Sequence, residues 1–234
     1  MSTLIVVRHG QASFGGRNYD VLSPLGERQG VVLGEHWKRV GQQFDAVYTG
    51  TLERQKLTAQ RTLEGMGLDG TPPPATVDPA YDEYDHKNLI RSYLPIIARE
   101  NPEFAIDRTE LLSDRRRFQR VMERITTLWL EGVPGELPLD ETWEQFRTRT
   151  EAGIRRIADS GAERSVLFTS GGVIGVAMRK ALNVTDDMAI KLNWRVYNAS
   201  VHMFWLGKRS DALLRFNDIS HLELAGDENL ITYR

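Results

Sequence analysis

The amino-acid sequence predicts an α/β protein: a three-layer sandwich in which a mostly parallel central sheet carries helices on both faces. Two observations support this prediction. Short runs rich in β-branched residues are each followed by a small polar loop. Each loop leads into a stretch with apolar residues at helical spacing. Strands that alternate with helices in this way pair in parallel, and the helices then cover both faces of the sheet.

The first strand-loop-helix unit is expected at the N-terminus. Residues 4–7 form a continuous apolar run that suits a strand covered on both faces, and His9 falls just past its carboxyl end. Ser23 and Pro24 offer an N-cap and a first-turn proline, and apolar residues recur at helical spacing after them. A helix is therefore expected to begin at this point.

A second unit follows directly. Residues 46–48 are expected to form a short strand, which leads through a Thr-Gly-Thr loop into a helix at about 52–66. Arg54 lies near the beginning of this helix. The segment 69–84 contains four prolines, which cannot donate backbone hydrogen bonds, so it is expected to be irregular. Glu83 is expected in or beside this loop.

The middle of the chain is expected to add two helices. Ser113 caps the first and Thr142 opens the second, with a turn that contains Gly and Pro between them. The aromatic residues expected in their core are Trp129, Trp143 and Phe146. Neither helix can bury its apolar stripe alone, so residues of about 86–150 are predicted to be a helical insertion in a single α/β domain, residues 1–234.

A third strand and a hairpin complete the predicted sheet. Residues 165–169 are expected to form the strand, and a Ser-Gly-Gly loop at 170–172 leads into an apolar helix at about 173–182. Segments 200–206 and 212–216 flank a polar turn. They are predicted to form an antiparallel hairpin at one edge of the sheet, near the C-terminus.

The composition limits the expected partners and compartment. The 30 Lys and Arg residues nearly balance the 32 Asp and Glu residues, so the net charge of −2 gives no reason to expect nucleic acid or an anionic membrane as a partner. No apolar run approaches the roughly 20 residues that cross a bilayer. The absence of cysteine excludes disulfides and suits the cytoplasm, which is the expected location.

Three polar segments are expected to converge on one pocket. Arg8 to Gln11, Arg54 and residues 170–172 all lie at the ends of predicted strands or at the start of the helices that follow. In open α/β sheets the carboxyl ends of the strands border the ligand crevice, and helix N-termini there point amide groups at anions. The sequence therefore predicts a phosphate-binding pocket, which the helical insertion is expected to roof.

Several motifs in this chain resemble the histidine phosphatase (phosphoglycerate-mutase-like) superfamily. They are Arg8-His9-Gly10 after the first strand, the D-x-L-[ST]-x-x-G-x-x-Q pattern from Asp20 to Gln29, the segment YTGTLERQKLTA with Arg54, and Asn-Ala-Ser-Val at 198–201. Glu83 occupies the position of the family's acid. The resemblance implies a phosphatase or phosphotransferase that acts on a small phosphorylated compound through a phosphohistidine at His9.

The expected chemistry gives each of these residues a role. A neutral imidazole at His9 attacks phosphorus, provided that an acceptor holds its second ring nitrogen and so selects the tautomer. Arg8 and Arg54 offer planar, permanently charged forks that fit phosphate oxygens. Glu83 protonates the leaving oxygen and later deprotonates water, if a poorly hydrated site raises its pKa. No metal and no cofactor is needed. The residues expected to line the entrance are Gln11, Phe14, Arg17 and Tyr84.

One position departs from the family pattern. The family has Ser-His-Gly-Gly after the late strand, whereas this chain has Ser170 at the position of the second pocket histidine, followed by Gly171. Serine donates a hydrogen bond to phosphate but supplies no positive charge, and loss of one preorganised donor costs about 2.7–4 kcal/mol in catalysis. Gly171 still allows close backbone approach to an anion. The alternative function is therefore a phospho-ligand-binding or regulatory protein with weak or lost catalysis.

Other interpretations have less support in the sequence. Ser170 follows a strand and precedes a helix, as in a hydrolase nucleophile elbow with Asp218 and His221 downstream, but Phe168 stands where that motif requires glycine. The acidic segment 82–86 lacks the spacing of known zinc and calcium motifs, and no phosphate-binding P-loop is present. A mutase is less expected than a phosphatase, because nothing in the sequence indicates that water is kept out.

Overall fold

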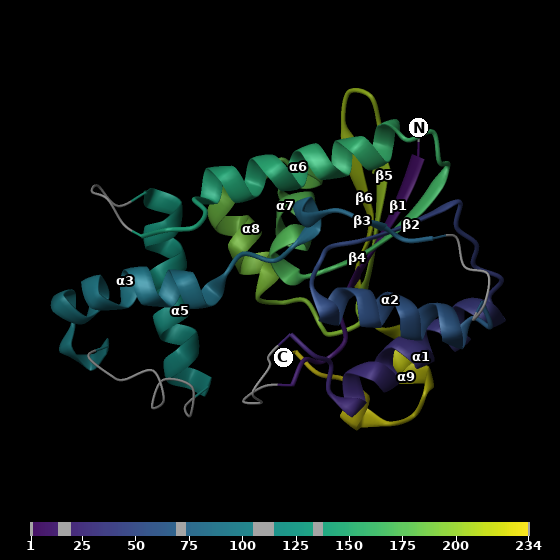
Figure 1. Ribbon diagram of the computed structural model, residues 1–234, viewed down its shortest axis with the longest axis horizontal. Coiled ribbons are helices and arrows are strands. Elements are labelled where there is room, and N and C mark those ends of the chain that lie inside the picture. Colours follow the sequence, from purple (N-terminus) through teal and green to yellow (C-terminus); the bar gives the residue numbers. More distant parts are fainter. Residues whose placement is uncertain (1, 14–19, 69–73, 105–114, 133–137, 234) are drawn as a thin grey trace. The chain divides into compact units, whose positions relative to one another are not determined.

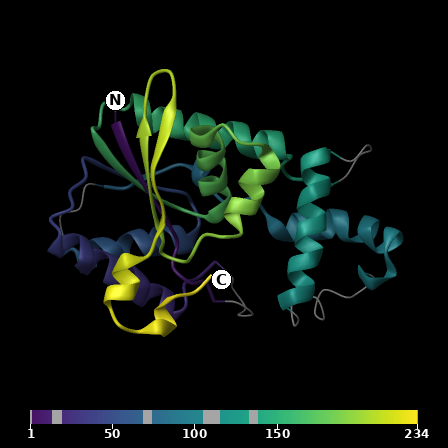
Figure 2. The same cartoon turned by 180° about the vertical axis from the view of Figure 1, so that it is seen from behind.

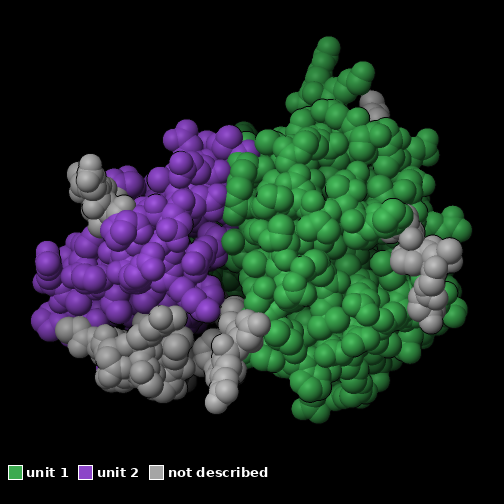
Figure 3. Space-filling view, viewed as in Figure 1, with its two compact units in different colours: residues 1–83, 149–234 green, residues 84–148 purple. Residues whose placement is uncertain are grey.

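The computed structural model of the chain describes most of its residues: 2–13, 20–68, 74–104, 115–132 and 138–233. The predicted cap Ser113 and the predicted entrance residues Phe14 and Arg17 lie outside these ranges. The chain forms two compact units, which Figure 3 distinguishes by colour: residues 1–83 with 149–234, and residues 84–148.

A single sheet forms the centre of the larger unit (Figure 1). Among the described residues it has six strands, in the order β3-β2-β4-β1-β5-β6. Their bounds are β1 Ser2–Arg8, β2 Ala46–Thr49, β3 Thr76–Val77, β4 Arg164–Thr169, β5 Val201–Leu206 and β6 Asp211–Asp218. The first four pair in parallel, and β5 and β6 form an antiparallel hairpin at one edge. The predicted mostly parallel sheet with an edge hairpin is confirmed.

Helices cover both faces of this sheet, with α1 and α2 on one side and α6 and α7 on the other (Figures 1 and 2). The helices of the larger unit are α1 Pro24–Arg39, α2 Glu53–Gly65, α7 Gly171–Leu182, α8 Asp186–Asn193 and α9 Ser220–Leu224, and α6 Trp143–Asp159 begins in the smaller unit. Two short 3-10 helices, η1 Pro79–Tyr81 and η3 Glu228–Leu230, complete this unit.

The core explains why β1 reads as one continuous apolar run. Successive strand residues point to opposite faces, and both faces are covered. Ile5 and Val7 belong to the core cluster that contains Leu33 and Trp37 of α1 and Phe168 of β4. Because β1 lies between β4 and β5, its carboxyl end is held on both sides.

The predicted helix starts at Ser23 and Thr142 are also confirmed. The Ser23 hydroxyl accepts a hydrogen bond from the Gly26 amide at 3.1 Å, directly before α1. At the start of α6, the Gln145 amide donates to Thr142 Oγ1 at 3.2 Å, and the Thr142 amide donates to Gln145 Oε1 at 2.8 Å. This reciprocal pair is a capping box, which satisfies two amides that the helix leaves unpaired.

The sequence prediction missed several elements. The first helix of the middle region is α3, His86–Glu100, which the prediction omits although the Asp85 carboxylate caps it through the amides of Lys87 and Asn88. Segment 69–84, predicted to be irregular, contains β3 and η1. A two-residue strand at a sheet edge tolerates neighbouring prolines because only one side is paired. Helices α8 and α9 were also not predicted.

The smaller unit contains α3, η2 Pro102–Phe104, α5 Arg115–Glu131 and the first turns of α6. Trp129, Trp143 and Phe146 are all buried, with ring centroids 5.3 to 5.9 Å apart. Their predicted core role is confirmed. No helix in the described part of the chain is long and apolar enough to span a membrane.

The packing of α1 on α2 depends on glycine, because a Cβ at Gly34 would lie 2.0 Å from the Thr62 carbonyl oxygen. Gly34→Ala is therefore expected to lower the free energy of unfolding by about 1–3 kcal/mol through overpacking. Glu35→Ala, on the exposed side of the same helix, is expected to change it by less than about 0.5 kcal/mol. Urea denaturation of both variants is the measurement, and equal stability of the two would contradict this account of the interface.

Candidate active site

The backbone of His9 is fixed at the end of β1 by both neighbouring strands. Its amide donates to the Thr169 carbonyl oxygen at 2.8 Å, at the end of β4. On the other side, its carbonyl oxygen accepts from the Ala199 amide at 3.2 Å and from Asn198 Nδ2 at 3.4 Å. Ala199 has a positive φ of 55°, a left-handed conformation in the turn before β5. The late Asn-Ala-Ser-Val element therefore braces the candidate nucleophile.

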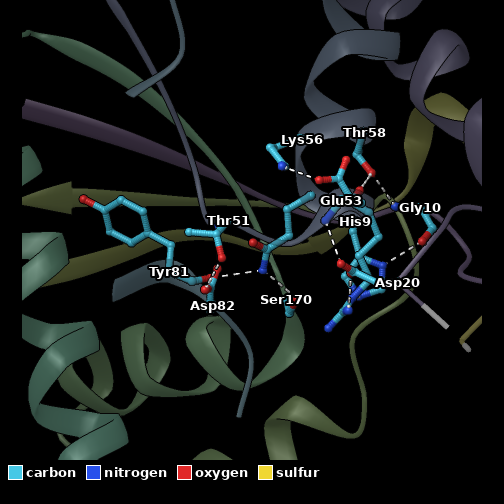
Figure 4. Close-up of polar contacts among 12 residues, drawn as sticks. His9, Gly10, Asp20, Thr51, Glu53, Lys56, Thr58, Tyr81, Asp82 and Ser170 are labelled. Atoms are coloured by element: carbon cyan, nitrogen blue, oxygen red, sulfur yellow. Dashed lines mark hydrogen bonds and ion pairs between the residues drawn. The ribbon is translucent and has the colours of Figure 1, made fainter. Parts of the chain in front are cut away.

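The ring of His9 is buried and oriented by two contacts (Figure 4). Nδ1 lies 2.7 Å from the carbonyl oxygen of Gly10, which only accepts, so Nδ1 carries the proton. Nε2 is then the unprotonated nitrogen, and Arg54 Nε donates to it at 3.3 Å. The carbonyl of Gly10 is the tautomer-selecting acceptor that the expected chemistry requires.

The electrostatics keep this imidazole neutral. Burial lowers the pKa of His9 well below its usual 6.5, and the positive charges of Arg54 and Arg8 lower it further. The hydrogen bond to Gly10 acts in the opposite direction but is the weakest of these effects. At neutral pH the Nε2 lone pair is therefore available to an electrophile.

Arg54 lies in the first turn of α2 and is buried. Its Nη1 pairs with Asp20 Oδ1 at 2.7 Å, while the other carboxylate oxygen of Asp20 accepts from the Glu53 amide at 2.9 Å. The N-cap residue of α2, Leu52, makes no side-chain cap, so Asp20 supplies one from another loop. The sequence places Asp20 in a motif, but its contact with Arg54 is visible only in the structure.

Arg8 is half-buried at the last position of β1. Its Nη1 donates to the carbonyl oxygens of Val196 and Tyr233, the latter at 2.9 Å. The charge of Arg8 lowers the pKa of His9, less than that of Arg54 does. Arg54 therefore contacts the imidazole directly, while Arg8 acts on it through its charge.

The loop after His9 is packed tightly on α1 and α2. A Cβ at Gly10 would lie 2.4 Å from the carbonyl oxygen of Gly26, so this approach requires glycine. The Gly10 amide donates to Thr58 Oγ1 at 3.0 Å, and that hydroxyl donates to the Arg54 carbonyl oxygen at 2.6 Å. The loop that orients His9 and the helix that carries Arg54 are therefore connected through Thr58.

Gln29, a buried residue of α1, also holds this loop in place. Its Oε1 accepts from the Gln11 amide at 2.8 Å, and its Nε2 donates to the Leu230 carbonyl oxygen at 2.7 Å and to Thr232 Oγ1 at 3.0 Å. The side-chain oxygen of Gln11 accepts from the Ser23 hydroxyl at 2.9 Å. Gln11, which the sequence places at the pocket entrance, thus anchors its loop to the start of α1.

Glu83 lies at the N-terminus of α7. Its two carboxylate oxygens lie 3.0 and 3.2 Å from the Gly172 amide nitrogen. The preceding residues are held by Arg149 of α6, whose Nη1 donates to the carbonyl oxygens of Pro79, Ala80 and Asp82 at 3.0 to 3.1 Å. The acidic loop is therefore an ordered support for Glu83.

Ser170 is fully buried at the N-cap position of α7, but its hydroxyl makes no capping bond. Its Oγ accepts from Gln55 Nε2 at 2.8 Å, a contact drawn in Figure 4. Within the described residues, no hydrogen bond joins its side chain to His9 or either arginine. A Cβ at Gly171 would lie 2.0 Å from Asn193 Oδ1, so this glycine lets the Asn193 side chain of α8 pack closely on the start of α7.

Tyr84, which the sequence places at the pocket entrance, belongs to the smaller unit. Its ring is buried in the aromatic core of that unit, and its centroid lies 5.0 Å from that of Trp129 and 5.5 Å from that of Phe146.

The structure does not support the hydrolase alternative at Ser170. Asp218 accepts hydrogen bonds from Ser220 and Arg215. In the described ranges no hydrogen bond links Ser170 to Asp218 or His221, so no nucleophile triad is formed there.

The described residues contain no group of three or more His, Asp or Glu side chains that is arranged to hold a metal ion.

Two further histidines support the site while remaining neutral. His202 of β5 is fully buried, and its Nδ1 accepts from the Asn217 amide at 3.2 Å, while Nε2 lies 3.1 Å from Ser200 Oγ. Burial lowers the pKa of His202 to about 3 and that of His221 to about 4. His202 joins Ser200 to Asn217 of the edge hairpin, and His221 of α9 bonds the backbone of Ala199.

The protein is therefore expected to lose stability on acidification. Between pH 6.5 and about 4, unfolded His202 and His221 bind protons that the folded forms exclude. The free energy of unfolding should fall as the pH drops through this window, by up to about 1.4 kcal/mol per pH unit for each histidine, and level off above pH 7. Urea denaturation at a series of pH values measures this dependence of the free energy of unfolding on pH. A His202→Gln variant should show a slope smaller by about one proton, and an unchanged slope would contradict the assignment.

The chain is similar to known proteins in both sequence and fold. Residues 4–219 match the model of the histidine phosphatase superfamily (branch 1). A 2,3-bisphosphoglycerate-dependent phosphoglycerate mutase of Bartonella quintana (strain Toulouse) is 32% identical over 93 residues, which is 37% of this chain and 44% of that protein. One of Brucella ovis is 32% identical over 94 residues, with the same coverage. The chain thus matches less than half the length of these curated relatives.

Solved structures share the fold over nearly the whole chain. A phosphoglycerate mutase from Bacillus anthracis str. Sterne has a TM-score of 0.64 at 20% identity, covering 97% of both chains. A mycobacterial glucosyl-3-phosphoglycerate phosphatase with inorganic phosphate has a TM-score of 0.61 at 19% identity, covering 94% of this chain and 99% of that one. Because the family model matches most of its length, the chain belongs to the histidine phosphatase superfamily.

Proposed function

We propose that this protein is a metal-independent phosphomonoesterase or phosphotransferase that acts on a small phosphorylated compound through a phosphohistidine at His9. The observation that carries the proposal is the state of the His9 ring. Its Nδ1 is held by the Gly10 carbonyl, and its neutral Nε2 faces the guanidinium of Arg54. A buried neutral nucleophile beside a permanent positive charge suits attack on a phosphoryl group.

The first step transfers the phosphoryl group to the enzyme. The Nε2 lone pair of His9 attacks phosphorus, and the bond from phosphorus to the ester oxygen breaks as Glu83 gives that oxygen a proton. Arg54 Nε then donates to a phosphate oxygen instead of to His9 Nε2, and Arg8 adds positive charge. Arrival of a dianion beside Glu83 favours its protonated form, because like charges disfavour ionisation.

The second step releases phosphate. Glu83, now ionised, takes a proton from water while the water oxygen attacks phosphorus. The bond from phosphorus to Nε2 breaks, which restores neutral His9 and protonated Glu83. An alcohol acceptor in place of water would give phosphotransfer by the same route, so the chemistry itself does not separate these two outcomes.

Ser170 and Gly171 are assigned to the phosphate side of the pocket in this proposal. Because the Ser170 oxygen accepts from Gln55, its hydrogen is the part left to donate to a phosphate oxygen. This donor brings no positive charge, and it is fully buried. That observation favours a second candidate function: a protein that binds a phospho-ligand with little or no turnover.

Replacement of the nucleophile tests the main proposal. His9→Ala is expected to reduce kcat/KM for phosphomonoesters about a thousandfold or more, because no covalent intermediate can form. His36→Gln, which alters a half-exposed histidine of α1, should retain wild-type rates. Turnover of a phosphoester panel and trapping of acid-labile phosphate on the protein are the measurements.

The same assay separates the two candidate functions. Turnover that is equal in the wild type and His9→Ala would exclude the phosphohistidine route. Binding of inorganic phosphate by calorimetry, without turnover of any ester, would instead support the binding function.

The role of Glu83 predicts a dependence on the leaving group. Glu83→Gln keeps an oxygen that can accept from the Gly172 amide but has no proton to give the ester oxygen. Its kcat is expected to fall about 10²- to 10⁴-fold with alkyl phosphates and less than about tenfold with p-nitrophenyl phosphate, whose leaving group needs no proton. Steady-state kinetics with both substrate types measures this. Equal losses for the two would assign Glu83 a structural role.

A further inference from the structure

Asp20 joins two parts of the candidate site that are far apart in sequence. One of its oxygens pairs with Arg54 Nη1 at 2.7 Å, and the other accepts from the Glu53 amide at 2.9 Å. The two bonds use different edges of the same carboxylate, and both partners belong to the first turn of α2 (Figure 4). The carboxylate is therefore held in one orientation by the helix that it also caps.

The pair also controls how Arg54 faces the nucleophile. Arginine is a rigid planar fork, so fixing Nη1 also fixes the direction of Nε. That Nε donates to His9 Nε2 at 3.3 Å. The Arg54 side chain is 8% exposed and that of Asp20 is 30% exposed, so this ion pair is shielded from water more than a surface pair.

A phosphoryl group that binds at His9 would meet an arginine whose charge is already partly neutralised. Phosphate oxygens and the Asp20 carboxylate compete for the same guanidinium, because each group offers two acceptor oxygens to its fork. The alignment of Arg54 favours catalysis, while competition from the Asp20 carboxylate lowers the affinity of Arg54 for inorganic phosphate. Weak product binding is compatible with a phosphatase that has to release phosphate.

We infer that Asp20 is a positioning residue that aligns Arg54 with His9 and moderates its affinity for phosphate. Only the expected effect of Asp20 on kcat rests on the proposed function. Its binding part concerns Arg54 and inorganic phosphate, and it holds whether or not the ester is turned over.

Asp20→Asn removes the charge while keeping one oxygen that can cap the Glu53 amide. Its kcat for a phosphomonoester is expected to fall about tenfold to a hundredfold, because Arg54 loses its alignment. Its dissociation constant for inorganic phosphate should fall about threefold to tenfold, because a competitor is gone. This opposite movement of kcat and phosphate affinity is not expected from general loss of structure.

Glu27→Gln is the matched control. Glu27 lies on α1 and pairs with Arg61 of α2 through Nε at 2.9 Å and Nη2 at 2.8 Å, so it is also a carboxylate bound to an arginine of the same helix. It has no contact with Arg54 in the described structure. The variant should match the wild type in kcat and in phosphate affinity.

Asp20→Glu separates charge from shape. It retains the carboxylate, so its kcat is expected to stay within about threefold of the wild type. A Glu variant as slow as the Asn variant would overturn the inference, as would an Asn variant with unchanged kcat and unchanged phosphate binding. Parallel loss of kcat and of phosphate affinity in Asp20→Asn would also overturn it, since Asp20 would then support the cradle as a whole.

Calorimetry with inorganic phosphate tests the role of Asp20 even if the proposed catalytic function is wrong. If the wild type turns over no ester, tighter phosphate binding by Asp20→Asn still supports the coupling of Asp20 to Arg54. Unchanged binding in that case overturns it.

Discussion

The hydrogen bond from His9 Nδ1 to the Gly10 carbonyl oxygen is the contact on which the rest of the site depends. It places the single ring proton on Nδ1 and leaves Nε2 as a lone pair directed at Arg54. A ring turned over would present a proton to any electrophile. Burial and two nearby guanidinium groups then keep the ring neutral, so orientation and charge state support the same chemistry.

That contact requires an unusually close approach of the loop after β1 to its neighbours. Gly10 touches the backbone of Gly26, and Gln29 ties the loop to the C-terminal segment through its buried amide. The Ser, Gly and Gln of the family pattern thus brace the loop that holds His9, while its Asp20 contacts the start of α2 instead. Glycine is needed where the backbones approach so closely that no Cβ fits. A buried side-chain amide is needed where backbone groups would otherwise lack a hydrogen-bond partner.

The site balances its positive charges with carboxylates of the chain. Asp20 lies at the start of α2 and pairs with Arg54, and Glu83 accepts from the amide at the start of α7. Helix N-termini attract anions, and here two of them already hold one. In the proposed mechanism, a phosphate that enters shares or displaces these carboxylates, so substrate binding depends on the positions of Asp20 and Glu83.

Local sequence determined every strand except β3, the starts of α1 and α6, and the positions of Arg8 and His9 at a strand end and of Arg54 at a helix start. It could do so because periodicity, caps and strand ends are short-range properties. Tertiary structure alone decided what those side chains contact. The pairing of Asp20 with Arg54, the burial of Ser170 against Gln55 and the support of Glu83 by Arg149 each join residues more than 30 positions apart. Helix α3 was missed because its interior proline weakens the local signal, whereas packing in the smaller unit overrides it.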